Sequence, residues 1–315
     1  MNIPIVRPME RFDAVSKIRE TGSQRGVGTG FRDLDKLWTM KRGFPLFVAG
    51  APHHGKSIFV KQLVVNAADN HGWRSLLFMA EEGGADDLIV DLVEMKIQMD
   101  ARKLTPGGLP NERCMSDQTF VDALSWVNRH FAIIDPDDVA NTNIPFTLDL
   151  FFEIARRESF DMTVLDPWND VDRDLEKHGG REDLQLTDAL RDIRRESAQQ
   201  NRIDIVVTHI AKVAADKKAD CGTRYQGHAM PTEWAGGQTW FRRAFTMLLV
   251  YRPPEGLVID ESGQPIEPGE CWVYCQKTKP KGVGRLGMVK LWWQRDKHRF
   301  VERDESQNEF GPNQR

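Results

Sequence analysis

GAPHHGKS, from Gly50 to Ser57, fits the pattern G-x-x-x-x-G-K-[ST] of a phosphate-binding loop at every required position. The loop lies between an apolar segment at 45–49 and a segment at 56–70 whose apolar residues have helical spacing. This context suits the motif, because backbone N–H groups and the helix N-terminus then face the phosphates. Lys56 is expected to reach the β- and γ-phosphates of ATP, and Ser57 to ligate Mg²⁺. The predicted nucleotide-binding residues are Gly50, Ala51, Pro52, His53, His54, Gly55, Lys56 and Ser57.

The rest of the chain predicts an α/β fold with a mostly parallel sheet. Apolar strands alternate with helices, and the early strands are apolar throughout, which is typical of parallel strands covered on both faces. Two late strands at 271–276 and 287–293 should form an antiparallel hairpin joined by a basic loop. The other expected strands are 45–49, 75–80, 131–134, 162–165, 203–208 and 245–251, and the expected helices are 56–70, 85–99, 148–157 and 184–201.

Composition and charge restrict the class of protein. Hydrophobic residues make up 40% and charged residues 29% of the 315 residues, as in ordinary globular domains. We see no signal peptide and no apolar run near the roughly 18 residues that span a membrane, so we expect a cytoplasmic protein without a membrane partner. The net charge of −4 argues against coating nucleic acid with the whole surface. Local cations, such as the eight Lys and Arg in 276–299, can still hold a strand inside a ring.

The four cysteines, Cys114, Cys221, Cys271 and Cys275, show no C-x-x-C pairing. Cys271 and Cys275 should share one face of a strand. Reduced, packed thiols are favoured there over a metal site.

Acidic and histidine side chains end three of the predicted strands. MTVLD ends on Asp166, which fits the magnesium-associated acid of a P-loop ATPase, although a strand-terminal Asp also serves as a turn or helix cap. The segment FMAEEG at 78–83 ends the second strand with two acids, Glu81 and Glu82, and a carboxylate there can orient the attacking water or accept its proton. IVVTH ends on His209, a position suited to sensing the γ-phosphate. Surface acids and a structural histidine are the alternatives for these last two sites.

The order of these motifs resembles the RecA-like motor domain of hexameric replicative helicases, the DnaB-type proteins, Twinkle and the phage primase–helicases. The resemblance runs from about residue 9 to residue 301 and implies a RecA-like P-loop NTPase core. The segments that carry it are GTGFRDLDKLW at 28–38, the phosphate-binding loop, F-x-x-E at 78–81, DPWND at 166–170, VVTHIAK at 206–212, the strand at 245–252 and YCQKTKPKGVGRLGMVKL at 274–291.

The resemblance implies roles for matching residues. Glu81 corresponds to the catalytic glutamate, Asp166 to the magnesium-associated aspartate and His209 to the γ-phosphate sensor. The family carries a K-x-R pair whose arginine reaches the nucleotide of the neighbouring subunit. Here the pair reads Lys277-Thr278-Lys279, and lysine cannot make the bidentate contact of arginine. Either Lys279 acts as a weaker finger or Arg285 reaches in, unless this hairpin is simply a solvated basic loop.

The resemblance also places the DNA-facing loops within 213–240. Lys217, Lys218 and Arg224 are candidates for phosphate contacts, and the backbone at Gly236 and Gly237 can approach a strand closely. The basic residue that the family carries ahead of the glycines is not evident. Trp234 and Trp240 lie in the same stretch, and their side chains either stack on bases or are buried.

The expected organisation is a lead at 1–25, a motor domain at 26–302 and a disordered tail at 303–315. The amphipathic stretch 9–18 in the lead should be a linker helix that docks on the next subunit. The resemblance implies ATP and Mg²⁺ as cofactors and a homo-oligomeric ring, expected to be a hexamer, moving 5′ to 3′ on single-stranded DNA. A minimal motor of this kind is expected in a phage or plasmid, with primase or a loader supplied separately.

Two alternatives to a helicase stay open. One is a RecA-like DNA-binding ATPase without unwinding activity, such as a recombination mediator or helicase loader, which the missing loop cation and acidic net charge favour. The other is a regulatory ATP switch that does not bind nucleic acid. The insertion-like segment 253–270 has no assigned role.

Overall fold

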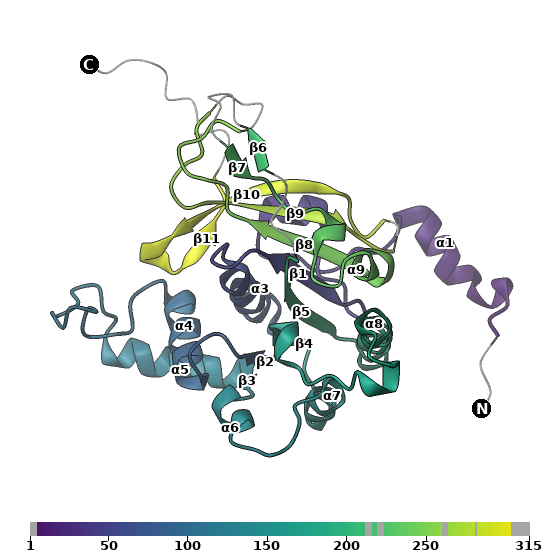
Figure 1. Ribbon diagram of the computed structural model, residues 1–315, viewed down its shortest axis with the longest axis horizontal. Coiled ribbons are helices and arrows are strands. Elements are labelled where there is room, and N and C mark those ends of the chain that lie inside the picture. Colours follow the sequence, from purple (N-terminus) through teal and green to yellow (C-terminus); the bar gives the residue numbers. More distant parts are fainter. Residues whose placement is uncertain (1–4, 212–215, 219–223, 260–263, 281, 304–315) are drawn as a thin grey trace.

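The computed structural model describes residues 5–211, 216–218, 224–259, 264–280 and 282–303. Its centre is a nine-stranded sheet with the strand order β11-β10-β9-β8-β1-β5-β4-β2-β3 (Figure 1). The strands are β1 Leu46–Gly50, β2 Ser75–Met79, β3 Phe131–Ile133, β4 Met162–Asp166, β5 Ile203–His209, β8 Thr246–Tyr251, β9 Glu270–Lys277, β10 Gly287–Gln294 and β11 Arg299–Val301.

The strand directions confirm the predicted mixed sheet. Strands β3, β2, β4, β5, β1 and β8 pair in parallel. Strands β8, β9, β10 and β11 pair antiparallel, so the sheet is extended on one side by the late hairpin and by β11, which was not predicted. The carboxyl ends of the parallel strands therefore meet at one edge of the sheet, where open α/β sheets place their ligands.

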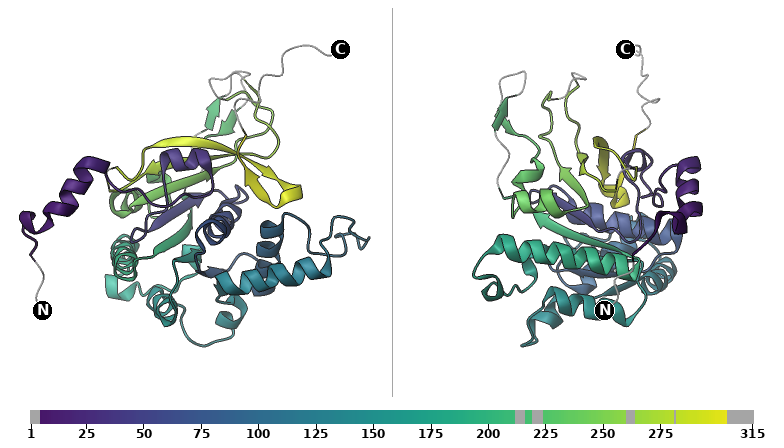
Figure 2. Two further views of the ribbon diagram at one scale, coloured as in Figure 1. Left: turned by 180° about the vertical axis from the view of Figure 1, so that it is seen from behind. Right: turned by 90° about the vertical axis from the view of Figure 1, so that its right-hand side faces the viewer.

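Helices cover both faces of this sheet, as the apolar strands require (Figure 2). Within β1, Leu46 and Val48 face one core, while Phe47 and Ala49 face the other, because side chains alternate along a strand. The first core packs α2 Arg32–Leu37, α3 Lys56–His71, α4 Ala85–Ile97 and α5 Asp117–His130. The second packs α7 Leu148–Arg157, α8 Glu182–Gln200 and α9 Gln238–Arg243. Shorter elements are α6 Pro136–Ala140 and the 3-10 turns η2 Trp168–Asp170, η3 Glu176–His178, η4 Pro231–Glu233 and η5 Arg295–Lys297.

Helix α5 was missed in the sequence, although its signals are present. Ser116 caps its start by accepting a hydrogen bond from the Thr119 N–H at 3.1 Å. Ala123 and Val127 are buried one turn apart. Leu124 and Val121 stay exposed, which blurs the apolar periodicity that would identify the helix.

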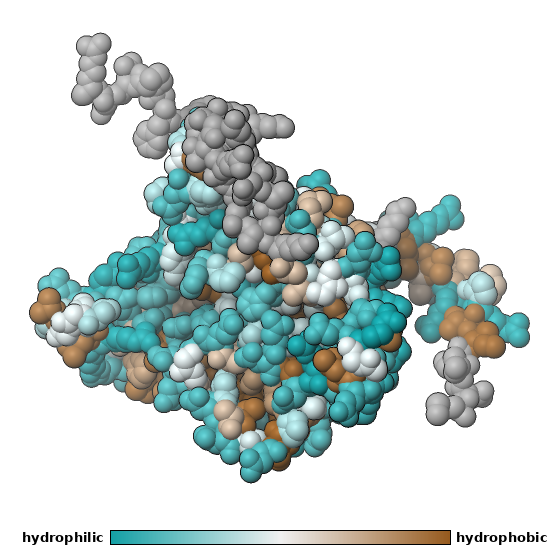
Figure 3. All heavy atoms as spheres, viewed as in Figure 1, coloured by the Kyte–Doolittle hydropathy of each residue, from teal (hydrophilic) through white to brown (hydrophobic). Residues whose placement is uncertain are grey.

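The N-terminal lead projects from the body of the molecule (Figures 1 and 2). It forms a 3-10 turn, η1 Pro8–Arg11, followed by α1 Phe12–Thr21, and contains no buried residue among those described. Figure 3 shows apolar residues exposed along this arm, and Phe12 and Val15 are more than half exposed. A helix thus forms near the predicted stretch 9–18, although it starts at Phe12, and its docking stays a prediction. The predicted disordered tail lies outside the described residues except for Arg303.

Cys271 and Cys275 face the same core from β9, as expected. Both thiols are free, and burial raises the pKa of each to about 12. They therefore act as packed apolar side chains. In the described part of the chain we find no group of three metal-ligating side chains and no helix able to cross a membrane. Cys221 lies outside the described residues.

Candidate nucleotide-binding site

The loop from Gly50 to Ser57 joins β1 to α3 at the carboxyl edge of the sheet. Two of its glycines are sterically required. A Cβ on Gly50 would lie 2.4 Å from the carbonyl oxygen of Val250, and Gly55 has a left-handed φ of +87° just before α3. The backbone thus adopts the tight strand–turn–helix course that the motif predicted.

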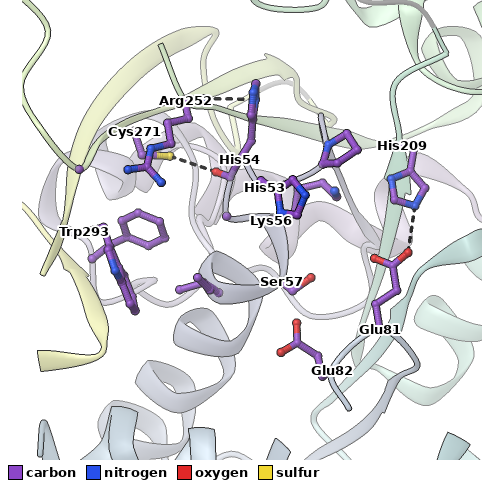
Figure 4. A pocket seen from close by; sticks show the side chains of 15 residues that line it. His53, His54, Lys56, Ser57, Glu81, Glu82, His209, Arg252, Cys271 and Trp293 are labelled. Carbon is purple, nitrogen blue, oxygen red and sulfur yellow. Dashed lines mark hydrogen bonds and ion pairs between the residues drawn. The ribbon is translucent and has the colours of Figure 1, made fainter. Parts of the chain in front are cut away.

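A cavity of about 640 Å³ opens beside this loop (Figure 4). Glu81, Glu82 and His209 line one side of it. The antiparallel extension of the sheet lines the other side. The complete lining is Pro52, His53, His54, Gly55, Lys56, Ser57, Ile58, Glu81, Glu82, His209, Arg252, Gly269, Cys271, Trp293 and Phe300.

Lys56 begins α3 and is only 6% exposed. Its Nζ donates to the carbonyl oxygen of Ala51 at 3.3 Å. Burial lowers the pKa of Lys56, while Asp166 and Glu81 act in the opposite direction. A buried ammonium with one long hydrogen bond has donors left for an anion, which fits the predicted contact to phosphate.

Asp166 ends β4 and is 2% exposed. Within the described residues neither of its carboxylate oxygens has a hydrogen-bond partner. Burial raises the pKa of Asp166 to about 6, with the Ser57 hydroxyl acting in the opposite direction. An orphaned buried carboxylate beside a hydroxyl fits a hard divalent cation, since Mg²⁺ prefers such oxygen ligands. Ser57 and Asp166 are therefore the residues that would hold the metal.

Glu81 and His209 face each other across the carboxyl end of β4 (Figure 4). Glu81 Oε1 lies 3.6 Å from His209 Nε2, and the glutamate side chain is 53% exposed. Burial lowers the pKa of His209, as does Lys56, while Glu81 and Asp170 raise it. An accessible carboxylate at this place can orient a water beside the loop that binds phosphate.

Residues on the antiparallel side of the cavity were missed in the sequence. Arg252 follows β8, and its backbone N–H donates to His54 Nδ1 at 3.3 Å. Burial lowers the pKa of His54 to about 4, so the imidazole is neutral and able to accept. Trp293 and Phe300 pack edge to face, with ring centroids 5.4 Å apart. This wall of aromatic rings and one guanidinium suits the base of a nucleotide. The position of Arg252 directly after a predicted strand was the one feature of the sequence that could have identified this side of the site.

The predicted finger residues do not lie in this cavity. Lys277 pairs with Met247 near the amino end of β8, whereas Trp272, at the other end of β9, pairs with Tyr251 beside the phosphate loop. Lys277 Nζ donates to the Phe241 carbonyl, and burial, assisted by Lys279, lowers its pKa to about 8.

Arg285 is exposed in the loop that follows β9. Its backbone N–H donates to the Leu37 carbonyl at 2.7 Å. Lys277, Lys279 and Arg285 thus belong to the edge opposite the nucleotide cavity, and their action across a subunit interface stays a prediction.

Three of the predicted DNA-contacting residues fall in a two-stranded antiparallel sheet formed by β6 Asp216–Lys218 and β7 Arg224–Gln226. Lys218 pairs with Arg224, and Lys217 lies next to Lys218 in β6. This small sheet follows β5 in the chain and projects beyond the main sheet (Figure 1). The positions are compatible with contact to a strand, which stays a prediction.

The tryptophans of this region are core residues. Trp234 and Trp240 are both fully buried, and Trp240 packs against Phe47 and Trp168. The hypothesis that they stack on bases is therefore wrong, and the buried alternative is confirmed.

Gly236 has a packing reason for being glycine. Its φ is +96°, and a Cβ there would lie 2.5 Å from Leu186 of α8. The approach of Gly236 and Gly237 to DNA stays a prediction.

No family model matches the chain. The chain is similar to the Twinkle homolog protein, chloroplastic/mitochondrial, of Arabidopsis thaliana, with 26% identity over 154 residues, which is 49% of this chain and 21% of that protein. The matched part of the chain thus spans about a fifth of this curated relative.

Solved structures share the fold. A structure described as an ATPase domain matches with a TM-score of 0.72 at 16% identity, over 96% of this chain and 100% of that chain. A DnaB-like replicative helicase, described with its interactions with primase, matches at 0.70 and 16% identity, over 96% and 68%. The RadB recombinase matches at 0.50 and 17% identity, over 86% and 97%. The RecA-like fold and the resemblance to DnaB- and Twinkle-type helicases are therefore confirmed.

Proposed function

We propose that this chain is the ATP-driven motor of a ring-forming DNA helicase, which moves along single-stranded DNA and separates duplex. The observation that carries the proposal is the meeting of four strand ends at one edge of the sheet. The ends of β1, β2 and β5 bring the phosphate loop, Glu81 and His209 around one cavity, and Asp166, at the end of β4, lies buried close to Ser57 and Lys56. Lys56 and Ser57 follow directly at the start of α3.

The chemistry proposed for this cavity is hydrolysis of the γ-phosphate of ATP. Lys56 binds the β- and γ-phosphates, and Asp166 with Ser57 holds Mg²⁺, which when bound neutralises phosphate charge. Glu81 orients a water and accepts its proton as the water oxygen bonds to phosphorus and the bond to the bridging oxygen breaks. His209 lies beside Glu81 and senses whether the γ-phosphate is present.

The positions of the two charged regions support assembly of several copies. The nucleotide cavity lies at one edge of the sheet and Lys277 at the other, so a copy placed head to tail can present its cations to its neighbour's nucleotide. Lys279 or Arg285 would then be the finger, and nucleotide would be hydrolysed between subunits. The exposed apolar residues of α1 supply a second contact, in which the helix docks on the next copy. A closed ring, with six copies as the expected number, is the assembly that we propose.

The link between nucleotide and DNA is proposed to run through the end of β5. Directly after His209, Ile210 forms a β-bridge with Trp234 and the Ala211 N–H donates to the Glu233 carbonyl. The segment between these anchors contains β6 and β7 with Lys217, Lys218 and Arg224. A shift of His209 on loss of the γ-phosphate is thereby passed to the segment proposed to hold single-stranded DNA.

Further partners and the cellular setting complete the proposal. A separate primase or loader is a proposed partner, and one solved structure of similar fold is described with its interactions with primase. We place the protein in the cytoplasm of a bacterium or of a phage-infected host, as part of a phage or plasmid replication system. The direction of movement, 5′ to 3′, is taken from the family that the chain resembles.

The deciding experiment measures steady-state ATP hydrolysis with and without single-stranded DNA, beside a Lys56→Ala variant. Stimulation by DNA that vanishes in the variant supports a translocating motor. Unwinding of a partial duplex then separates a helicase from a recombination mediator or loader, which would hydrolyse ATP without separating strands. If the rate of ATP hydrolysis depends on Lys56 but is the same with and without single-stranded DNA, the helicase proposal is wrong and a regulatory ATP switch is favoured.

A further inference from the structure

A buried lysine, Lys61, contacts the segment that carries Glu81 and Glu82. Lys61 is on α3, one helical turn beyond Ser57, and its side chain is 3% exposed. Its Nζ contacts Oε2 of Glu82 and lies 2.6 Å from Oδ2 of Asp91 on α4. Burial lowers the pKa of Lys61, but the two carboxylates outweigh burial and the net shift is upward. The residue is therefore a permanent cation with two anionic partners.

Lys61 does not line the nucleotide cavity, whereas its partner Glu82 does. Glu82 lines the cavity together with Glu81, and the Asp166 carboxylate is close enough for both glutamates to raise its pKa. Lys61 lines a different, smaller cavity behind α3. Three carboxylates near a polyanionic ligand would repel it strongly at short range. The charge of one of the three, Glu82, is offset by Lys61, a cation that lies outside the nucleotide cavity and is shared with Asp91.

The same ion pair fixes the segment that carries Glu81. On one side of Glu81, the Ala80 N–H donates to the Asp166 carbonyl oxygen at 2.8 Å, which extends the β2–β4 pairing. On the other side, Glu82 is held by Lys61, and the chain then turns through Gly83 and Gly84, both with positive φ. Glu81 is the residue between these two anchors, and its carboxylate faces His209.

We infer that Lys61 is a positioning residue of the nucleotide site, which offsets the charge of Glu82, holds it away from the phosphates and leaves Glu81 as the carboxylate that faces the ligand. This inference rests on the proposed function, because it takes the cavity to bind a nucleoside triphosphate. Lys61 acts through Glu82 and touches neither substrate nor metal. Its replacement by an uncharged side chain would free Glu82 and leave its negative charge beside the phosphates without a counter-ion.

The test uses the full chain and measures binding of fluorescent ADP and of a fluorescent non-hydrolysable ATP analogue, both with Mg²⁺. In Lys61→Met we expect about tenfold weaker binding of the ATP analogue and a smaller loss for ADP, because repulsion grows with ligand charge. Adding Glu82→Gln to Lys61→Met should restore most of the loss, and Lys61→Arg should bind like the parent chain. The kcat of ATP hydrolysis should follow the same order.

A matched control is Lys96→Met, since Lys96 on α4 pairs with Asp69 on α3 and ties the same two helices away from Glu82. This control should change neither dissociation constant. Because Lys61→Met leaves buried charge unpaired and can unfold the chain, the double variant and Lys61→Arg keep the test decisive. Equal losses for ADP and the ATP analogue, or a folded double variant that binds as poorly as Lys61→Met, would overturn the inference.

The inference and the proposed function fail in different ways. A parent chain that binds no nucleotide overturns both. If the parent chain binds nucleotide and Lys61→Met binds it with the same affinity, the inference alone is overturned.

Discussion

Glu81 and His209 approach to 3.6 Å although β2, which ends two residues before Glu81, and β5, which ends on His209, do not pair with each other. Strand β4 lies between the two, and its last residue is Asp166. A carboxylate, a carboxylate and an imidazole thus lie at or just after the ends of three consecutive parallel strands, at one edge of the sheet. This arrangement makes the roles of the three residues separable by substitution, because each comes from its own element.

Replacing Glu81 tests the proposed catalytic carboxylate. Glu81→Gln should lower the kcat of ATP hydrolysis by about 10²- to 10⁴-fold, because an amide cannot accept the proton of the attacking water. Nucleotide affinity should stay within about threefold of the parent chain, since the side chain is half exposed and the residue contributes little to packing. Single-turnover hydrolysis and equilibrium binding measure the two quantities. Loss of both together would assign Glu81 to binding instead.

Asp166 should make stability depend on pH and on Mg²⁺. Its pKa of about 6 in the folded chain is above the ordinary 3.8, so the folded state holds a proton that the unfolded state releases. Between these two values stability falls as pH rises, by up to about 3 kcal/mol for this group. In metal-free buffer at pH 8, Asp166→Asn should therefore melt higher than the parent chain.

The difference between Asp166→Asn and the parent chain should vanish below about pH 4, where the carboxyl is protonated in both states. Adding Mg²⁺ with nucleotide should raise the melting temperature of the parent chain and leave the variant unchanged. Thermal unfolding across this pH range checks the prediction. A variant that melts lower than the parent at pH 8 without metal would contradict it.

The finger residues are predicted to act on a neighbouring copy. Lys56→Ala and the double variant Lys279→Ala/Arg285→Ala should each be inactive alone. Mixed in equal amounts and allowed to reassemble, they should recover activity at about a quarter of the interfaces, where an intact cavity meets intact cations. ATPase assays on the mixture measure this recovery. A mixture as inactive as its components would contradict the proposal that Lys279 or Arg285 acts on the nucleotide of a neighbouring copy.

The exposed face of α1 should drive assembly. Phe12→Glu combined with Val15→Glu should shift the protein toward monomers in mass photometry and lower ATP turnover, because charge prevents burial of this face. Arg19→Glu on the same helix is the control and should assemble normally. An unchanged ring with the double substitution would show that the helix is not part of the interface.

The sequence was sufficient for those parts of the site that follow from local pattern. The phosphate loop, Glu81, Asp166 and His209 each end an apolar strand, and parallel strands bring their carboxyl ends together. The finger positions lie apart from the cavity of their own chain for a reason of topology. The antiparallel pairing of β9 with β8 directs Lys277 to the opposite edge.

The rest depended on contacts between segments distant in sequence. Trp293 and Phe300 reach the cavity because β10 and β11 extend the sheet past β9. The sequence predicted β10 as part of the late hairpin, but it predicted neither β11 nor the approach of these two rings to the phosphate loop. The role of Trp234 could not be predicted, because the sequence pattern around an aromatic residue in a loop is the same whether its side chain stacks on a base or packs in the core. Likewise, Lys61 looks like any helical lysine until Glu82 is placed against it.

The bridges beside His209 have a consequence for how the molecule can change. The Ala235 N–H donates to the His209 carbonyl at 2.9 Å, and the Ala211 N–H donates to the Glu233 carbonyl at 2.7 Å. These backbone hydrogen bonds hold the two ends of the intervening segment side by side. They do not involve the residues within the segment. Closure of a segment costs little more when it is lengthened, and its ends here are already joined. We therefore expect the segment proposed to contact DNA to tolerate insertions, deletions or replacement by the matching segment of a relative. The nucleotide site should keep its geometry when the segment is changed.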